Sequence, residues 1–441
     1  MLLVLLFFVS IALLIFLIAK CKLHAFLSLL TTAVFFGVLS GTSLPEVATA
    51  IASGFGSTMQ SIGIVIACGI IIGQFLELTG GAQRISDAIL KIIGIKHSTY
   101  AVSLTGALVS IPVFCDSGFV ILNPVIKGIS RRGKIAYSTL CVALMAGLLT
   151  THSFIPPTPG PVAAAALLDA DLGKVMLYGI IVAIPIVIVA SIWANSRFVR
   201  GKYPEIAEEN VVDEKHEEEF KTVVEHAPST FRSFLPIVIP IILIVCNSFF
   251  GDEEGSSVQQ IIYFLGQPYI ALMFGAGLCF LLPTKINETV TNTWISTALQ
   301  GAAEIILITA AAGSFGKVLQ LTSIGTTLTD LISASGLPPI LVPYIMSTFL
   351  TIAMGSTTVS MTTTSGIMAP LLATLGLSPE IVVMAVAAGG FTFCQANSSY
   401  FWCVSKLCGY DLKKGYWLIT LTSVIMGVTG IIATCILNIF V

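Results

Sequence analysis

Asp116 is the residue of this chain whose type and position point most directly to chemistry. It stands in the sequence Cys-Asp-Ser-Gly, inside a long apolar stretch. An aspartate at the centre of a membrane helix costs roughly 2.5–3.5 kcal/mol on insertion scales, so it is rarely found there without a role. Asp116 could carry a proton, ligate a cation or bond a substrate hydroxyl, with Ser117 and Gly118 beside it in a binding site. The alternative is a structural aspartate that caps a half-helix.

A second candidate site is the hydroxyl-rich segment Gly355–Pro370, G-S-T-T-V-S-M-T-T-T-S-G-I-M-A-P. Helix starts at such a break present free N–H groups and a partial positive charge, which suit a carboxylate, whereas released carbonyls could coordinate Na⁺. Threonine hydroxyls that bond back to their own helix are the structural alternative for about half of the set. The substrate-binding candidates in this segment are Ser356, Thr357, Thr358, Thr362 and Thr363.

Two further titratable side chains could bind and release a proton. His152 directly precedes the proline-rich sequence S-F-I-P-P-T-P-G-P, which cannot continue a helix. Its imidazole could bind substrate or titrate near physiological pH, although a histidine bonded to a neighbouring carbonyl is a close alternative. Glu77 is the other candidate; like Lys317, it lies near the end of an apolar run. Either could extend to the membrane interface, and we favour that interpretation for Lys317.

The sequence Q-A-N-S-S-Y-F-W (395–402) completes the candidate set. Its Asn397, Ser398 and Ser399 carry hydrogen-bonding groups that would suit a polyhydroxy ligand.

The elements that must hold these residues are membrane helices. Of the 441 residues, 56% are hydrophobic and only 10% are charged, and the mean hydropathy is +0.97. Many uncharged runs reach the roughly 20 residues that cross a ~30 Å hydrocarbon core. A net charge of −2 without a basic domain argues against a nucleic-acid partner. The ten cysteines lie mostly in apolar runs and do not resemble a disulfide framework.

We predict an all-α membrane protein with ten full spans and two re-entrant hairpins. The apolar segment 2–19 is read as a retained span, because no positive charge precedes it while Lys20 and Lys22 follow. The hairpins are placed at 98–127 and 338–370. The predicted spans are 2–19, 25–42, 60–79, 135–161, 174–195, 233–250, 259–282, 300–320, 380–402 and 415–440.

The distribution of lysine and arginine supports this topology. With the N-terminus outside, only Lys174 and Lys317 of the 21 basic residues fall outside the inward loops. The outward loops at 43–59, 251–258 and 322–337 contain none. Treating either hairpin as a full span would reverse everything after it and destroy the asymmetry, so the positive-inside rule favours the hairpins and outward-facing termini.

The chain divides into two related halves. Residues 1–196 and 233–441 each contain five spans and one hairpin, and the acid-rich segment 197–232 reads as a cytoplasmic linker. Residues 73–89 match 316–332 at six of seventeen positions, at an offset of 243. Because five spans is an odd number, the second half starts from the opposite side, which predicts inverted repeats. Broken segments at Ser110–Pro124 and Gly355–Pro370, in corresponding places, indicate a secondary transporter whose substrate lies between them.

Six motifs spread over nearly the whole chain resemble the gluconate permease family: G-x-x-L-E-x-T-G-G-A (73–82), F-C-D-S-G-F-V-I-L (114–122), H-S-F-I-P-P-T-P-G-P (152–161), G-S-F-G-K-V-L (313–319), M-G-S-T-T-V-S-M-T-T (354–363) and N-S-S-Y-F-W (397–402). The resemblance implies a proton-coupled importer of gluconate or related sugar acids, and some relatives take D-serine. One departure matters. Gln395 and Ser398 stand where many members have histidine and aspartate, which leaves the substrate and the coupling ion open.

We therefore expect a multi-pass transporter of the bacterial inner membrane, with termini on the periplasmic or extracellular side. It would import a small hydroxy-carboxylate with a proton or sodium ion, by alternating access, and could assemble as a homodimer. A sodium-coupled carrier of another organic anion or of an amino acid is the main alternative. An enzyme is disfavoured, since the chain has no G-x-S-x-G, H-E-x-x-H or Walker A motif, and no cofactor is expected.

Overall fold

The computed structural model describes residues 2–93, 97–202, 205, 227–324, 327 and 337–441, and every regular element in these ranges is helical. The predicted all-α class is thus confirmed. Six helices are long and apolar enough to cross a membrane, and a bent helix pair would make a seventh. The predicted linker 197–232 and the predicted outward loop 322–337 lie largely outside the described residues.

The helices of the first part of the chain are α1 (Leu2–Ile15), continued by a π-helical turn (Phe16–Lys20), α2 (Ala25–Leu39), α3 (Leu44–Leu78), α4 (Gly81–Ile93), α5 (Ser98–Val109), α6 (Cys115–Gly133), α7 (Tyr137–Phe154), α8 (Pro159–Leu167), α9 (Leu172–Ala194) and α10 (Arg197–Lys202). Those of the second part are α12 (Thr230–Phe250), α13 (Ser257–Gly266), α14 (Pro268–Leu278), α15 (Trp294–Gln320), α17 (Leu341–Met354), α18 (Thr357–Met368), α19 (Leu372–Leu375), α20 (Pro379–Gly390), α21 (Ser399–Leu407), α22 (Leu412–Gly415) and α23 (Leu421–Leu437).

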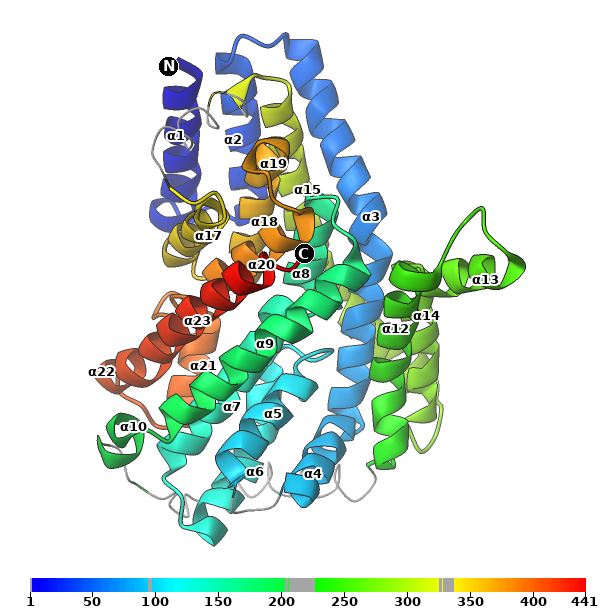
Figure 1. Cartoon of the computed structure of the whole chain (residues 1–441), viewed down its shortest axis with the longest axis vertical. Helices are drawn as coiled ribbons and strands as arrows, with labels where there is room; N and C mark the ends of the chain where they lie inside the picture. The colour runs from blue at the N-terminus through cyan, green and yellow to red at the C-terminus, as the bar shows by residue number, and fades with distance from the viewer. Residues whose placement is uncertain (1, 94–96, 203–204, 206–226, 325–326, 328–336) are drawn as a thin grey trace.

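The helices α3 and α15 pack along each other and connect the two parts of the chain (Figure 1). Small residues allow this close approach: a Cβ atom on Gly54 would lie 2.6 Å from the Gly313 carbonyl oxygen. Ser314 Oγ also donates to the Ile51 carbonyl at 2.9 Å. Helix α2, from the first part of the chain, packs against α15 of the second part, and α14 of the second part packs against α3 of the first.

Both predicted hairpins are present as helix–break–helix units, but their breaks are shorter than predicted. The first unit is α5–α6, and its break covers only 110–114. Helix α6 therefore runs through Pro124, which was predicted to lie in the broken segment. The second unit is α17–α18, with a break at 355–356 and an intact helix from Thr357 to Met368. The hydroxyl-rich segment is thus a helix that follows a sharp turn.

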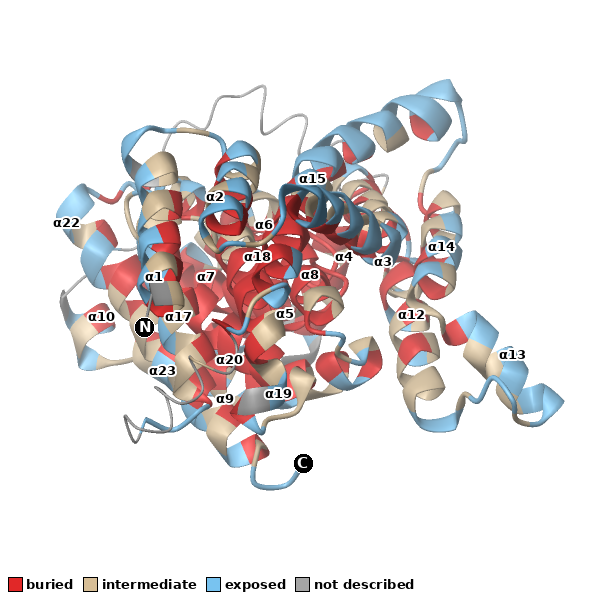
Figure 2. Ribbon diagram, turned by 90° about the horizontal axis from the view of Figure 1, so that it is seen from above, coloured by how far each residue is buried: buried red, intermediate tan, exposed pale blue. Residues whose placement is uncertain are grey.

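Two predicted spans, 135–161 and 380–402, are interrupted helices. The first is α7 and α8, separated by 155–158, and the second is α20 and α21, separated by 391–398. The four prolines of the first pair explain its break, because proline lacks the N–H that a continuing helix needs. Every residue of α7 is buried. Figure 2 shows that α7, α8, α18 and α20 form the buried centre, while α13 and α22 are largely exposed.

Three other predictions are corrected by the structure. Most of the predicted outward loop 43–59 is the first half of α3, which Ser43 caps. The predicted span 259–282 is the bent pair α13–α14, with an angle of 67° where Pro268 begins the second helix. Residues predicted to form a loop after Thr79 instead form the amphipathic helix α4, with Lys91 in its last turn.

Candidate functional site

The first hairpin break places Asp116 in the first turn of α6, where free backbone N–H groups lie. Its side chain is half-buried. The thiol of Cys403, on α21, donates to the Asp116 carbonyl oxygen over 3.7 Å. Cys394 and Tyr400 also lie close to Asp116. The candidate carboxylate therefore faces residues of the second broken helix, although the two are far apart in the sequence.

Helix α3 supports this first break. The Glu77 side chain lies close to the Ser117 side chain, and both residues are half-buried. One turn earlier, a Cβ atom on Gly73 would lie 2.2 Å from the Pro112 carbonyl oxygen, so only glycine permits this contact. The structure thus brings Glu77, Asp116 and Ser117 into one cluster. Gly118 is also in it, packed so that a Cβ atom would be 2.5 Å from Leu148 Cδ2.

His152 lies beside the same break, in the last turn of α7. It is buried, with 6% of its surface exposed, and its ring centroid is 5.8 Å from that of Phe114. Its Nδ1 atom has no hydrogen-bond partner within the described part of the chain. The carbonyl-bonded histidine considered from the sequence is therefore not seen at Nδ1. What His152 contacts is an aromatic ring next to Asp116, rather than the carboxylate itself.

The second hairpin break contacts the second broken helix directly. Gly355 adopts a left-handed conformation (φ 72°), and a Cβ atom on it would lie 2.3 Å from the Asn397 carbonyl oxygen. Ser356 caps α18 by accepting from the Val359 backbone N–H at 3.4 Å. The side chains of Gln395 and Asn397 both donate to the Ile352 carbonyl, at 3.1 and 2.9 Å. Two amides thus satisfy a carbonyl that the end of α17 releases.

Hydroxyl groups from the start of α23 and from the π-helical turn before it (Tyr416–Thr420) hold the break at 391–398 in place. Thr420 Oγ1 donates to the Cys394 carbonyl at 2.6 Å, and Ser423 Oγ accepts from the Cys394 N–H at 3.0 Å. Side chains therefore satisfy backbone groups that a broken membrane helix cannot satisfy itself. The consequence is that the interrupted helix α20–α21 contacts both hairpins: its break touches Ile352–Gly355 of the second, and Cys403 of α21 contacts Asp116 of the first.

The remaining predicted substrate-binding residues form two groups, one beside the helix breaks and one deeper in α18. Thr357 and Thr358 are half-buried in the first turn of α18, while Ser398 precedes α21 and Ser399 begins it in an exposed position. Thr362 and Thr363 lie one to two turns deeper and are each only 1% exposed. The Thr363 hydroxyl has no hydrogen-bond partner among the described residues. Direct contact of Thr362 and Thr363 with a ligand would require a change of conformation.

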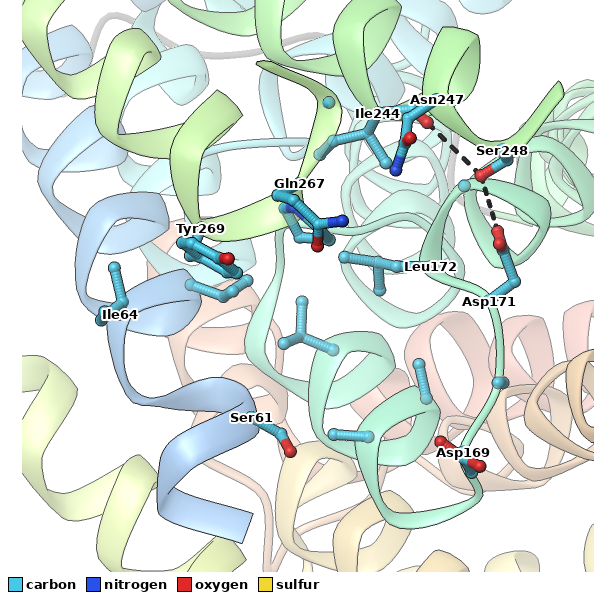
Figure 3. Close-up of a pocket in the computed structure, with 18 of the residues that line it drawn as sticks. Ser61, Ile64, Asp169, Asp171, Leu172, Ile244, Asn247, Ser248, Gln267 and Tyr269 are labelled. Carbon is cyan, nitrogen blue, oxygen red and sulfur yellow. Dashed lines mark hydrogen bonds between the residues drawn. The ribbon is translucent and has the colours of Figure 1, made fainter. Parts of the chain in front are cut away.

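Two cavities, which sequence reasoning missed, lie along α3. The larger is a cleft of about 830 Å³ between α3, α12, the α13–α14 bend and the turn before α9, which we call the polar cleft (Figure 3). In it, Ser248 Oγ donates to Asp171 Oδ1 at 2.7 Å. The smaller, of about 170 Å³, is lined by Lys317, which we call the Lys317 cavity. None of the residues predicted to form the site lines either cavity. The one feature of the sequence that could have pointed to the smaller cavity is Lys317, the lysine of the motif G-S-F-G-K-V-L.

A strongly apolar chain in which two helical hairpins converge on an interrupted helix defines a multi-pass membrane transporter. The model of the GntP family permeases matches residues 1–440, and this protein belongs to that family. It is 36% identical to an uncharacterised permease of Haemophilus influenzae, over 96% of this chain and 90% of that protein. It is 30% identical to the high-affinity gluconate transporter of Escherichia coli, over 98% of both chains, and 30% identical to the L-idonate transporter of the same organism, over 96% of this chain and 97% of that one.

Solved structures share the fold at low sequence identity. MtrF of Neisseria gonorrhoeae superposes with a TM-score of 0.67 at 14% identity, covering 96% of this chain and 97% of that one. The YdaH transporter of Alcanivorax borkumensis gives 0.64 at 13% identity, covering 90% and 88%. The resemblance to gluconate permeases read from the sequence motifs is therefore confirmed, and the chain is a permease rather than an enzyme.

Proposed function

We propose that this permease imports a small hydroxy-carboxylate, such as gluconate or a related sugar acid, together with a cation, by alternating access. The observation that carries the proposal is the convergence of both hairpins on the interrupted helix α20–α21. This arrangement joins a carboxylate, Asp116, to amide and hydroxyl donors at Asn397 and Ser398 and to the first turn of α18. These groups match a ligand that carries one carboxylate and several hydroxyls. The named relatives that carry gluconate and L-idonate support the same substrate class.

Helix boundaries support the proposal of two inverted repeats, residues 1–196 and 233–441, joined by a cytoplasmic linker 197–232. Helices α2 and α14 begin at Ala25 and Pro268, and α5 and α17 begin at Ser98 and Leu341, in each case 243 residues apart. Helices α9 and α23 end at Ala194 and Leu437, which are also 243 residues apart. The packing is reciprocal as well: α6 contacts α21, and its counterpart α18 contacts α8. Repeats of opposite orientation would give alternating access two equivalent states.

We assign the coupling role to Asp116, with Glu77 and His152 as its neighbours, and we favour a proton. Gln395 and Ser398 provide no titratable group at the second break, so the first break must supply it. Sodium is the second candidate, because helix ends release carbonyl oxygens that can coordinate it. The Ile352 carbonyl is already bonded to two amides, which leaves fewer oxygens for Na⁺ at the second hairpin.

The deciding experiment is uptake into proteoliposomes that contain the purified protein. Labelled gluconate, glycerate, D-serine and citrate would each be offered with an imposed pH gradient or an imposed Na⁺ gradient, and protein-free vesicles would be the control. We expect saturable accumulation of a sugar acid that is driven by the pH gradient and abolished by a protonophore. Accumulation driven only by Na⁺ would establish the alternative. Flux that does not saturate would contradict a carrier mechanism.

A further inference from the structure

Lys317 lines a cavity that no part of the proposed site explains. The cavity lies between α3, α8, α15 and α18, and its volume of about 170 Å³ corresponds to roughly five or six water molecules. Its polar walls include Ser57, Thr58 and Ser61 of α3, with Gln320 one turn beyond Lys317. Such a volume can hold the carboxylate end of a small organic anion.

The position of the Lys317 side chain depends on a glycine of α3. A Cβ atom on Gly54 would lie 2.8 Å from Lys317 Cβ, which is closer than two carbon atoms can approach. Gly313 and Gly316 keep the neighbouring turn of α15 equally close to α3 and α18. The small residues thus let the start of the lysine side chain lie over α3, where Lys317 lines the cavity.

Lys317 carries an uncompensated charge. Its Nζ atom donates to Gln320 Oε1 at 3.4 Å, and within the described ranges no carboxylate forms an ion pair with it. Lys317 is also the one basic residue lining either cavity. An ionisable side chain on a membrane helix without a partner is favoured only when something else satisfies its charge. Lys317 is exposed, so solvent can hydrate its ammonium group, and an anion bound beside it would satisfy the charge more strongly.

The Lys317 cavity and the polar cleft are neighbours along α3, because Ser57, Ser61 and Ala166 line both. Ser57 Oγ donates to the Gly54 carbonyl at 3.3 Å and Ser61 Oγ to the Ser57 carbonyl at 3.1 Å, so each hydroxyl oxygen can still accept a hydrogen bond from a ligand. Lys317 lies in the last turn of α15, on the side that the charge asymmetry assigns to the exterior.

We propose that Lys317, with Gln320 beside it, binds the carboxylate of the incoming anion at an entry site before the anion reaches the hairpin breaks. This inference rests on the proposed function and adds to it a specificity-determining cation. The ligand class is a small monocarboxylate with hydroxyl groups. These hydroxyl groups can donate hydrogen bonds to the serine oxygens of α3. A neutral polyol of the same size would gain nothing from the lysine.

The first test is kinetic and uses labelled gluconate in proteoliposomes. We expect Lys317→Gln to raise KM at least tenfold while kcat changes less than threefold, because one charge-assisted contact is lost at the entry site. Lys317→Arg should keep KM within about threefold. Lys174→Gln, which removes the other basic charge assigned to the exterior but lines neither cavity, is the matched control. An unchanged KM in Lys317→Gln would overturn the inference.

A second test reports on the site without requiring transport. Ser61→Cys, which lines both cavities, would be made in a Cys21→Ser background that removes the one exposed native cysteine and keeps Lys317. We expect a thiosulfonate to label position 61, and gluconate, but not sorbitol, to slow the labelling; adding Lys317→Gln should abolish that protection. Equal labelling rates with and without gluconate would contradict the entry site. If wild-type protein transports none of the tested acids, the proposed function fails; if it transports gluconate but both tests give negative results, only the role of Lys317 fails.

Discussion

The Asn397 side chain donates through Nδ2 to the Ile352 carbonyl oxygen at 2.9 Å, which ties the interrupted helix α20–α21 to the tip of the second hairpin. Gln395 donates to the same oxygen at 3.1 Å. Because α21 also contacts Asp116 through Cys403, this bond helps to set how far apart the two hairpin breaks lie. The geometry of the proposed substrate site therefore depends on a small number of amide contacts.

We expect Asn397→Ala to reduce sugar-acid uptake at least tenfold while lowering the unfolding free energy by only about 1 kcal/mol, the usual net value of one hydrogen bond. The loss should appear in both KM and kcat, because the side chain positions the second hairpin and also offers polar groups to the ligand. Uptake and thermal unfolding of the purified variant would be measured together. Asn292→Ala, at an exposed asparagine before α15, is the control. Wild-type uptake in Asn397→Ala would remove this segment from the site.

We expect Asp116→Asn to abolish gradient-driven accumulation while leaving the protein in the membrane. Asparagine keeps the shape of the side chain and removes its charge, so exchange of internal for external substrate can continue without a coupled ion. The measurement compares accumulation under a pH gradient with counterflow in the absence of a gradient. Asp252→Asn, at an exposed aspartate after α12, should behave like wild type. Accumulation with the wild-type pH dependence would make Asp116 a structural cap.

Gly73→Ala should disturb the first hairpin break, because the new Cβ would lie 2.2 Å from the Pro112 carbonyl oxygen. Backbone atoms cannot move aside as a flexible side chain would, so we expect a destabilisation of about 1–3 kcal/mol and a larger loss of uptake. Gly63→Ala, on the same helix but in open space, is the matched control and should leave both properties unchanged. Thermal unfolding in detergent and uptake would both be recorded; equal behaviour of the two variants would contradict the close contact.

The thiols of Cys141 and Cys408 should be the pair most readily linked by an oxidant. Their Sγ atoms lie 2.8 Å apart, on α7 and directly after α21, although the residues are 267 positions apart in sequence. After treatment with copper phenanthroline, the denatured protein should have two fewer thiols that react with an alkylating reagent than the untreated sample has. Cys408→Ser should remove the difference, whereas Cys435→Ser should not. Failure to link the wild-type pair would place α21 elsewhere relative to α7.

A cysteine introduced as Lys215→Cys in a cysteine-depleted background should be inaccessible to a membrane-impermeant maleimide in intact cells and should react after permeabilisation. The reason is the charge asymmetry, which assigns the 197–232 linker to the cytoplasm. A cysteine at position 42, between α2 and α3, should show the opposite behaviour. Labelling of position 215 from outside would reverse the proposed topology.

The existence of both hairpins and both interrupted helices could be predicted because glycine, proline and hydroxyl side chains break apolar runs at those places. The lengths of the breaks could not be predicted from the sequence. Gly355 completes the turn in a left-handed conformation and Ser356 caps the next helix at once, so two residues suffice where a longer loop was expected. Pro124 is accommodated inside α6, which hydropathy alone cannot reveal.

The first half of α3 was predicted as a loop for a similar physical reason. Residues 43–59 are rich in alanine, glycine, serine and threonine, whose low hydropathy is typical of loops. In a membrane protein the same small residues permit close helix packing, and here Gly54 and Thr58 contact Gly313. The Lys317 cavity could not be predicted either, because a lysine near a helix end is more often found at the membrane interface than in a cavity.

Helix α3 has a consequence for the lipid in which the protein works. Its 35 residues span about 52 Å, whereas the hydrocarbon core of a typical bilayer is about 30 Å thick. A helix longer than the hydrocarbon core is accommodated by inclining it, by letting its less apolar end protrude, or by thickening the surrounding lipid, each at a modest energetic cost. Because α3 contacts the first hairpin break at Gly73 and the Lys317 cavity at Gly54, acyl-chain length should act on both sites at once, so vesicles of different thickness become a means to adjust transport without altering a single residue.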